Sequence, residues 1–123
     1  MKHIIIDTNA LMAIAELKID IFSEIERMAD FKYEVVILEG TMIELKKIMA
    51  DQKMKYKRAA KLVVDIITKK KIKIIENTGK VDDVLTEHSK KGDLILTQDR
   101  ELKKRLTKPY LTIRQGKTIV MVR

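Results

Sequence analysis

Short apolar runs that end on polar residues recur along this chain. They occur at residues 4–6, 35–38 and 94–96, and residues 72–75 are apolar except for Lys73. An uninterrupted apolar run bounded by polar turn-formers predicts a strand buried on both faces, as in a parallel sheet covered by helices. We therefore expect strands at residues 4–6, 33–38, 71–76 and 94–96.

The segments between these runs have the spacing of amphipathic helices, with apolar residues on one face and charged residues outside it. The first predicted helix starts just past residue 9, and the second covers residues 21–29. A third starts at residue 41, and a longer helix lies around residues 59–67. Another covers residues 81–91, and the last ends before Pro109. Thr41 and Glu44 match a capping box, so the third helix is expected to begin at Thr41, after a turn at residues 39–40. On the longer helix, residues 59, 62, 63, 66 and 67 are predicted to face the core. Residues 111–114 and 118–122 are expected to form a closing hairpin.

Strands that alternate with helices predict a fold class of α/β, with a mainly parallel sheet. We expect residues 1–123 to form a single domain, a three-layer α/β/α sandwich. The first and fourth strands should be adjacent at the centre of the sheet.

Composition excludes several kinds of protein. The chain has no cysteine, so disulfides and thiolate metal sites are excluded, and His3 and His88 lack further nitrogen or sulfur ligands at zinc-like spacing. No apolar run reaches the ~20 residues of a membrane span, and the amino terminus leads directly into the first strand. We therefore expect a cytoplasmic protein without a membrane association.

The net charge of +8 favours a polyanionic partner, whereas the aromatic content of 4% argues against recognition by base stacking. Contacts to an RNA backbone are therefore expected. The alternative is that the excess lysine is solvated surface, as in many proteins rich in both Lys and Glu. The predicted RNA contacts lie on two helices: Lys53, Lys57, Arg58 and Lys61 on one, and Arg100, Lys103, Lys104 and Arg105 on the other.

Acidic residues occur at successive strand-to-helix junctions. Asp7 and Asp99 each end a strand, whereas Glu44 and Asp82 lie near helix starts. Each acid has a structural explanation by itself, because Asp7, Asp99 and the pair Asp82 and Asp83 suit helix starts and Glu44 suits the capping box. Their coincidence is not explained in this way, since a parallel sheet brings all of these junctions to one edge, where ligands bind.

Four segments resemble motifs of the PIN domain nucleases, and they occur in the family's order at residues 5–11, 42–45, 82–85 and 96–102. The resemblance implies a central parallel sheet and a ribonuclease dependent on a divalent metal. Residues 100–106 and 113–117 resemble the archaeal and eukaryotic branch linked to ribosomal RNA processing. The chain departs from the family at residues 39–40, where a proline often stands.

The resemblance assigns catalysis and metal binding to Asp7, Glu44, Asp82 and Asp99. Carboxylate oxygens suit Mg²⁺ or Mn²⁺, the expected cofactors. Asp82 is preferred to Asp83 as the third acid, because its register places Leu85 and Ser89 on the buried face; Asp83 is the alternative. Asn9 and Thr97, neutral hydrogen-bonding groups beside the acids, are expected to orient them.

Two other functions remain open from the sequence. A VapC-like toxin would differ by having a small antitoxin protein that covers the acidic site. An RNA-binding scaffold would have lost the catalytic use of its acids, an outcome that the presence of all four acids argues against. The number of metal ions, the RNA cleaved and a homo-oligomeric state are also left open.

Overall fold

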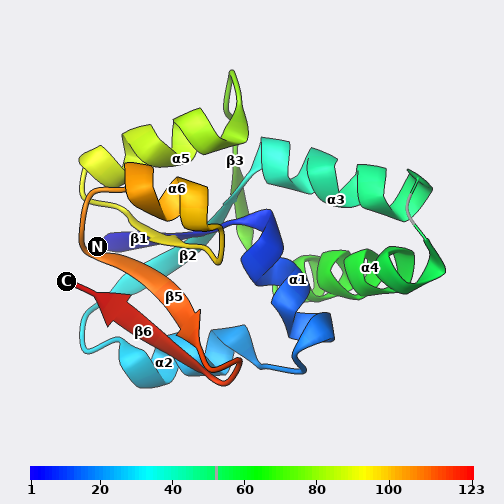
Figure 1. The fold of residues 1–123 in the computed structure, drawn as a ribbon, viewed down its shortest axis with the longest axis horizontal. Coiled ribbons are helices and arrows are strands. Elements are labelled where there is room, and N and C mark those ends of the chain that lie inside the picture. Colours follow the sequence, from blue (N-terminus) through cyan, green and yellow to red (C-terminus); the bar gives the residue numbers. More distant parts are fainter. Residues whose placement is uncertain (52) are drawn as a thin grey trace.

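Six strands form one sheet in the order β3-β2-β1-β4-β5-β6 (Figure 1). The structure is a computed structural model that describes residues 1–51 and 53–123. Its strands are β1 (Lys2–Ile6), β2 (Tyr33–Leu38), β3 (Lys73–Ile75), β4 (Leu94–Leu96), β5 (Tyr110–Arg114) and β6 (Thr118–Val122). All neighbouring strands are parallel except β5 and β6. The mainly parallel sheet, the closing hairpin and the central pair β1 and β4 are confirmed.

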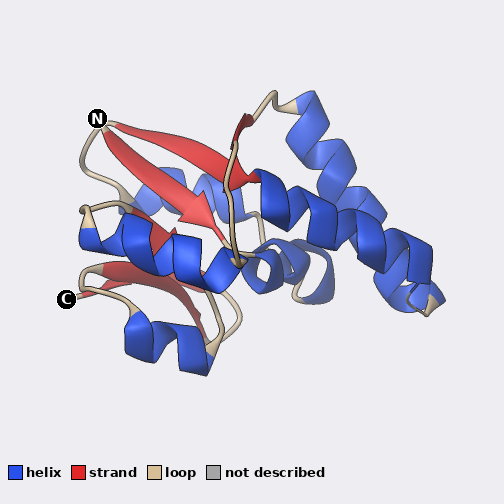
Figure 2. Cartoon of the chain, turned by 90° about the horizontal axis from the view of Figure 1, so that it is seen from above, coloured by secondary structure: helices blue, strands red, loops and turns tan. Residues whose placement is uncertain are grey.

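Helices cover the sheet on both faces (Figure 2). They are α1 (Thr8–Glu16), α2 (Ile21–Met28), α3 (Glu39–Asp51), α4 (Met54–Lys69), α5 (Val81–Lys90) and α6 (Arg100–Arg105). Figure 1 shows α3 and α4 running side by side away from the sheet. Within the described residues, no helix combines the length and the apolar character that crossing a membrane would require.

Two hydrophobic clusters form the interfaces between the three layers. Ile4 and Ile6 of β1 face a cluster that includes residues of α1, α2, α3 and α4. Ile5, between them, faces the other side with Leu85 of α5 and Leu102 of α6. Alternate strand residues point to opposite faces, so a fully apolar strand is buried between two helical layers. The α/β/α sandwich is confirmed.

One strand boundary and the buried face of one helix differ from the sequence prediction. The third strand is β3, Lys73–Ile75, and not residues 71–76. Lys71 has a φ of 54°, and the backbone N–H of Ile72 donates to the carbonyl of Ile67, so these residues close the end of α4. On α4 the buried residues are Ala59, Ala60, Val63 and Ile67. Leu62, predicted to be buried, is 45% exposed, because the helix turns its alanines toward the core.

The predicted capping box at the start of the third helix is wrong. Strand β2 continues directly into α3 at Glu39, so residues 39–40 form the first turn of the helix. Thr41 therefore lies inside the helix, buried, and its hydroxyl has no hydrogen-bond partner in the described part of the chain. Glu44 is consequently free to turn toward α1 and the edge of the sheet.

Candidate active site

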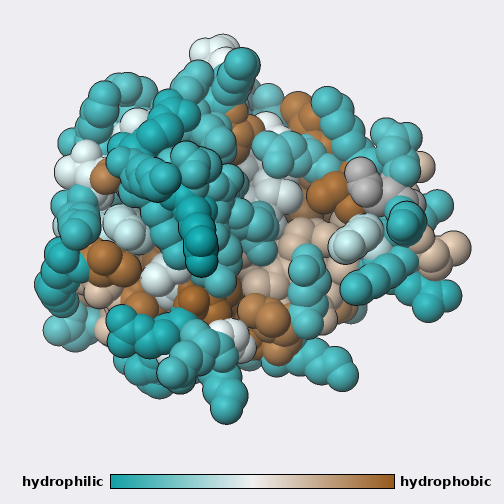
Figure 3. Space-filling model, in the orientation of Figure 1, coloured by the Kyte–Doolittle hydropathy of each residue, from teal (hydrophilic) through white to brown (hydrophobic). Residues whose placement is uncertain are grey.

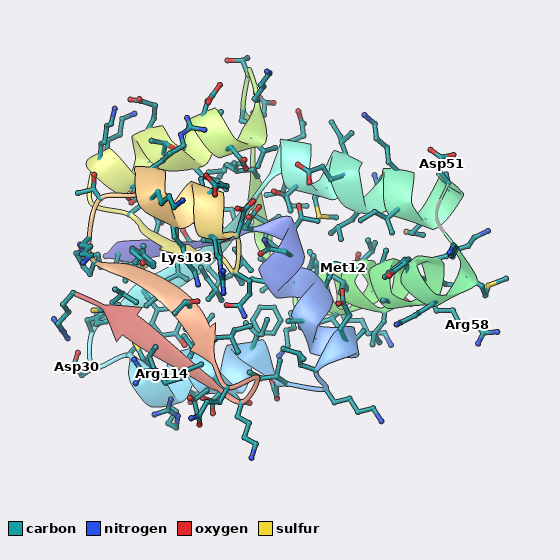
Figure 4. All side chains as sticks on the ribbon, viewed as in Figure 1. Met12, Asp30, Asp51, Arg58, Lys103 and Arg114 are labelled. Carbon is teal, nitrogen blue, oxygen red and sulfur yellow. The ribbon has the colours of Figure 1, made fainter. Side chains whose placement is uncertain are left out.

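A pocket of about 910 Å³ opens at the edge of the sheet where the strands end. All four acids predicted from the sequence line it, together with Asp83 and the neutral residues Thr8 and Asn9. Met12 and Ile48 contribute apolar surface from α1 and α3. Figure 4 shows Met12 in the centre of the molecule, on α1. The pocket is thus built from residues far apart in sequence that the parallel topology brings together.

Asp7 is the buried acid of the pocket, with 6% of its surface exposed. Its backbone N–H donates to the carbonyl of Leu96 over 2.9 Å, which fixes the end of β1 against β4. One carboxylate oxygen accepts from the backbone N–H of Thr8 at 2.8 Å, so Asp7 does cap α1. The other oxygen accepts from the hydroxyl of Thr97 at 2.9 Å.

Burial raises the pKa of Asp7 to about 6, since removal from water penalises its charged form. The hydrogen bonds from Thr97 and Thr8 act in the opposite direction and lower this pKa. The negative charges of Asp82 and Glu44 raise it further. The ionisation of Asp7 is therefore sensitive to the other acids and would be favoured by a nearby cation.

Glu44 reaches the pocket from the second turn of α3. One of its carboxylate oxygens accepts from the hydroxyl of Thr8 at 2.8 Å. Thr8 thus orients two acids, Asp7 through its backbone and Glu44 through its side chain. The sequence prediction gave Thr8 no role in the site, although its position next to Asp7 was the available clue.

Asp99 follows β4 and caps α6, since one carboxylate oxygen accepts from the N–H groups of Glu101 and Leu102 at 2.9 and 3.2 Å. Its own backbone N–H donates to the hydroxyl oxygen of Thr97 at 3.1 Å. The hydroxyl of Thr97 therefore connects the backbone of Asp99 with the carboxylate of Asp7. Asp99 therefore both caps α6 and lines the pocket.

Asn9 holds the loop that follows β4. Its side-chain oxygen accepts from the backbone N–H of Gln98 at 3.0 Å and lies 3.4 Å from the hydroxyl of Thr97. Gln98 in turn accepts from the hydroxyl of Thr112 and the N–H of Ile113, both at 2.8 Å. Thr97 thus bonds an acid directly, whereas Asn9 acts on the loop that carries Asp99.

Asp82 and Asp83, both in the first turn of α5, differ in their partners. Asp83 accepts from Arg105 at 2.6 Å in an exposed ion pair. The charge of Asp82 instead influences Asp7. Leu85 and Ser89 are both buried, as the register of Asp82 predicts. Thr86, which the register of Asp83 places on the buried face, is buried as well, so Asp82 stays the predicted third acid and Asp83 the alternative.

Of the predicted RNA-binding residues, Arg105 lines the pocket and the others do not. Figure 4 shows Arg58 on α4 and Lys103 on α6, on opposite sides of α1. Burial lowers the pKa of Lys103, and Arg100 contributes to this shift. The basic residues that line the pocket are Lys80 and Arg105. The sequence prediction missed Lys80, which stands directly before the acids of α5.

The pocket has the donor chemistry of a magnesium or manganese site. In the part of the chain that the structure describes, no group of three or more His, Cys, Asp or Glu side chains is close enough to form a ready-made metal site. Mg²⁺ does not require one, because it keeps several waters and binds through one or two carboxylates and the substrate phosphate. The carboxylates of the pocket fit that mode of binding.

Comparisons with known proteins agree with this arrangement. A model of the family described as "PIN like domain" matches residues 4–116. Ribonuclease VapC4 of Methanocaldococcus jannaschii is 29% identical over 123 residues, which are 95% of this chain and 94% of that protein. The structure of the PIN domain endonuclease Utp24 superposes with a TM-score of 0.77 at 25% identity, covering 98% of this chain and 91% of the other. A domain of a functionally unknown protein from Methanocaldococcus jannaschii has a TM-score of 0.56 at 14% identity, with both chains fully covered at 100%.

Proposed function

This chain belongs to the PIN-like domain family, and on that basis we propose that it is a ribonuclease that hydrolyses RNA phosphodiester bonds internally with the help of Mg²⁺ or Mn²⁺. We also propose that residues 1–123 act as one such domain. The names of two relatives, Ribonuclease VapC4 and the PIN domain endonuclease Utp24, support a nuclease.

One observation carries the proposal: Asp7, Glu44, Asp82 and Asp99 line one pocket although they come from four separate junctions of the chain. Acidic residues that served only as helix caps would not need to share a pocket. A pocket lined by carboxylates repels an RNA phosphate unless a cation neutralises it. A metal-dependent reaction on a phosphodiester is therefore the chemistry that suits this site.

We assign metal binding to Asp7, Glu44, Asp82 and Asp99. A bound divalent cation would polarise the scissile phosphodiester and lower the pKa of the attacking water. Thr97 and Thr8 hold the Asp7 carboxylate by hydrogen bonds that favour its charged form. The hydroxyl of Thr8 donates to the Glu44 carboxylate and so orients it.

The basic residues would supply the affinity for RNA. Lys80 lines the pocket and can contact a phosphate next to the scissile bond. Lys53, Lys57, Arg58 and Lys61 of α4 and Arg100, Lys103 and Lys104 of α6 would bind phosphates further along the strand. Phosphate contacts of this kind position the RNA without reading its sequence.

Two biological roles fit this activity. The similarity to Ribonuclease VapC4 over almost the whole chain favours a VapC-like toxin, with an antitoxin protein as partner. The resemblance of residues 100–106 and 113–117 to the branch of the family linked to ribosomal RNA processing favours that role instead. A partner protein that abolishes cleavage by covering the pocket would distinguish the first role from the second.

The test is cleavage of a structured RNA in Mg²⁺, Mn²⁺ or EDTA by the parent and by Asp7→Asn. Asp65→Asn is the matched control, because Asp65 is an exposed acid of α4 outside the pocket. We expect cleavage by the parent and the control only with metal, and none by Asp7→Asn. Cleavage in EDTA, or cleavage by Asp7→Asn near the parent rate, would contradict the proposal.

A further inference from the structure

One aromatic side chain stands apart from the others in this chain. Phe22, Phe31 and Tyr33 pack against the first hydrophobic cluster, and Tyr110 packs against the second. Tyr56, in the first turn of α4, is instead 39% exposed. An exposed aromatic ring contributes little hydrophobic stabilisation to the fold, so core packing does not account for Tyr56. Its position relative to the acids can therefore indicate a functional role.

Tyr56 lines the pocket of the four acids and also a smaller neighbouring hollow of about 240 Å³. The two hollows share Tyr56 and Glu16, so the ring lies where they meet. Lys55 and Arg58 line the smaller hollow. Figure 3 shows apolar atoms, in tan and brown, on the surface over α1 and the adjoining part of α4.

The charges around the ring suit a polyanion. Lys55 Nζ lies 5.7 Å from the centre of the Tyr56 ring, and Lys57 and Arg58 follow on the same turn of α4. All three cations are exposed. An aromatic face beside cations is the arrangement by which proteins bind single-stranded nucleic acid, stacking a base while contacting the backbone.

We propose that Tyr56 is a stacking platform for the base next to the scissile phosphate of an unpaired RNA segment. This inference rests on the proposed function, which places the scissile phosphate at the acids. The next nucleotide would lie in the smaller hollow, with its base on Tyr56 and its phosphate near Lys55 or Arg58. A base in a duplex would first have to leave its stack, which costs free energy, so paired RNA is disfavoured. The sequence had predicted backbone contacts without stacking, because aromatics are scarce; one ring at the right place suffices.

The experiment uses a fluorescently labelled, unstructured RNA and the same RNA annealed to its complement. Single-turnover cleavage in Mg²⁺ at increasing protein concentration separates half-saturation from maximal rate, and anisotropy in EDTA measures binding alone. The variants are Tyr56→Ala and Tyr56→Phe. Ile74→Ala is the matched control, because Ile74 is a comparably exposed apolar residue, on β3, that lines neither of the two hollows.

For unpaired RNA we expect Tyr56→Ala to bind about 5- to 150-fold more weakly, the range that corresponds to one base stacked on an aromatic ring. The maximal rate should change little, because stacking acts on bound substrate and transition state alike. Tyr56→Phe and Ile74→Ala should match the parent, and the annealed RNA should bind weakly to every variant. An RNA with an abasic site next to the cleaved bond should bind the parent more weakly than the intact RNA does. Tyr56→Ala should bind the abasic and the intact RNA equally.

Unchanged binding by Tyr56→Ala, or equal losses from the abasic site in parent and variant, would overturn the stacking proposal. A parent that cleaves RNA while Tyr56→Ala behaves identically leaves the proposed nuclease intact and removes only the role of Tyr56. A parent that binds RNA through Tyr56 but cleaves none in any metal would instead reject the nuclease.

Discussion

The hydroxyl of Thr97 donates to the carboxylate of Asp7 over 2.9 Å and is buried with it at the centre of the sheet edge. The same oxygen accepts from the backbone of Asp99. One side chain therefore favours the charged form of one acid and positions the other. Because Thr97 is the residue after β4, the pairing of β4 with β1 determines this relationship.

Thr97→Val should test this link. Loss of the hydroxyl removes a hydrogen bond that lowers the pKa of Asp7, so that pKa should rise further. We expect the acidic limb of the cleavage profile to move to higher pH, and cleavage at neutral pH to fall by about 10- to 100-fold. Thr97→Ser retains the hydroxyl and should keep the parent profile. An unshifted profile in Thr97→Val would show that the hydrogen bond has no part in the reaction.

Asp7→Asn and Asp99→Asn should lose the response to metal without losing the fold. Asn caps helices about as well as Asp, so α1 and α6 should keep their starts. The melting temperature without metal should be unchanged or raised, because repulsion among the acids is relieved. Added Mn²⁺ should raise the melting temperature of the parent but not of either variant, since only bound metal stabilises the folded state. Equal metal stabilisation of parent and variants would remove these acids from the metal site.

Stability without metal should depend on pH through Asp7. Its folded pKa of about 6 lies above the ordinary value of 3.8, so between these values the folded state binds the extra proton. Protonation of Asp7 therefore adds about 3 kcal/mol to the free energy of unfolding. This contribution is complete below pH 3.8 and is lost as the pH rises through about 6. Denaturant unfolding in EDTA between about pH 3.5 and pH 8 measures the free energy of unfolding. The difference in this free energy between the parent and Asp7→Asn should show the fall. A constant difference would mean that Asp7 is not shifted.

Gly40→Ala should strain the contact between the starts of α3 and α5. A Cβ at residue 40 would meet the Cγ2 atom of Val81 at 2.7 Å, and the N–H of Gly40 already bonds the side chain of Asn77. We expect destabilisation of about 1 to 3 kcal/mol from overpacking and reduced cleavage, because Val81 precedes Asp82. Introducing Gly40→Ala into a Val81→Ala background should cost much less, as thermal unfolding of all four proteins would reveal. Additive effects of the two changes would contradict the proposed contact.

Charge reversal on α4 should weaken RNA binding without moving the cleavage position. Lys57→Glu changes a cation beside Tyr56, whereas Lys117→Glu changes an exposed lysine in the turn between β5 and β6. Only the first should lower affinity and reduce the slope of log affinity against log salt, which is about −0.7 per phosphate neutralised on a single strand. Equal effects of the two changes, or an affinity of the parent that does not depend on salt, would mean that these lysines are solvated surface residues and do not bind RNA.

Much of the fold was predictable because the deciding interactions are local or periodic. Residues 4–6 and 94–96 are apolar without interruption, and only a strand covered on both faces buries such a run. Alternation with helical segments then fixed a mainly parallel sheet, as the structure confirms. The four acids could be placed at one edge for the same reason, since the carboxyl ends of parallel strands lie together.

The prediction failed where a side chain had both a local and a distant partner. Thr41 and Glu44 have capping-box spacing, yet α3 begins two residues earlier and Glu44 accepts from Thr8, 36 positions away in the chain. Leu62 likewise continues the apolar stripe of its helix but is exposed where the helix turns its alanines inward. The spacing of residues in the sequence indicates only the local partner of a side chain and not a partner that is distant in the chain.

The sequence by itself determined the layers of this protein, the order of its elements and the identity of its acids, because helix and strand periods and the chemistry of carboxylates are properties of short segments. Only the tertiary structure decided which groups hold those acids, that Asp83 pairs with Arg105 while Asp82 influences Asp7, and that Tyr56 lies beside the acid pocket. Those relationships depend on how helices distant in sequence pack against one sheet. Side-chain contacts across such distances are fixed by the packing of the whole core, which no local pattern encodes.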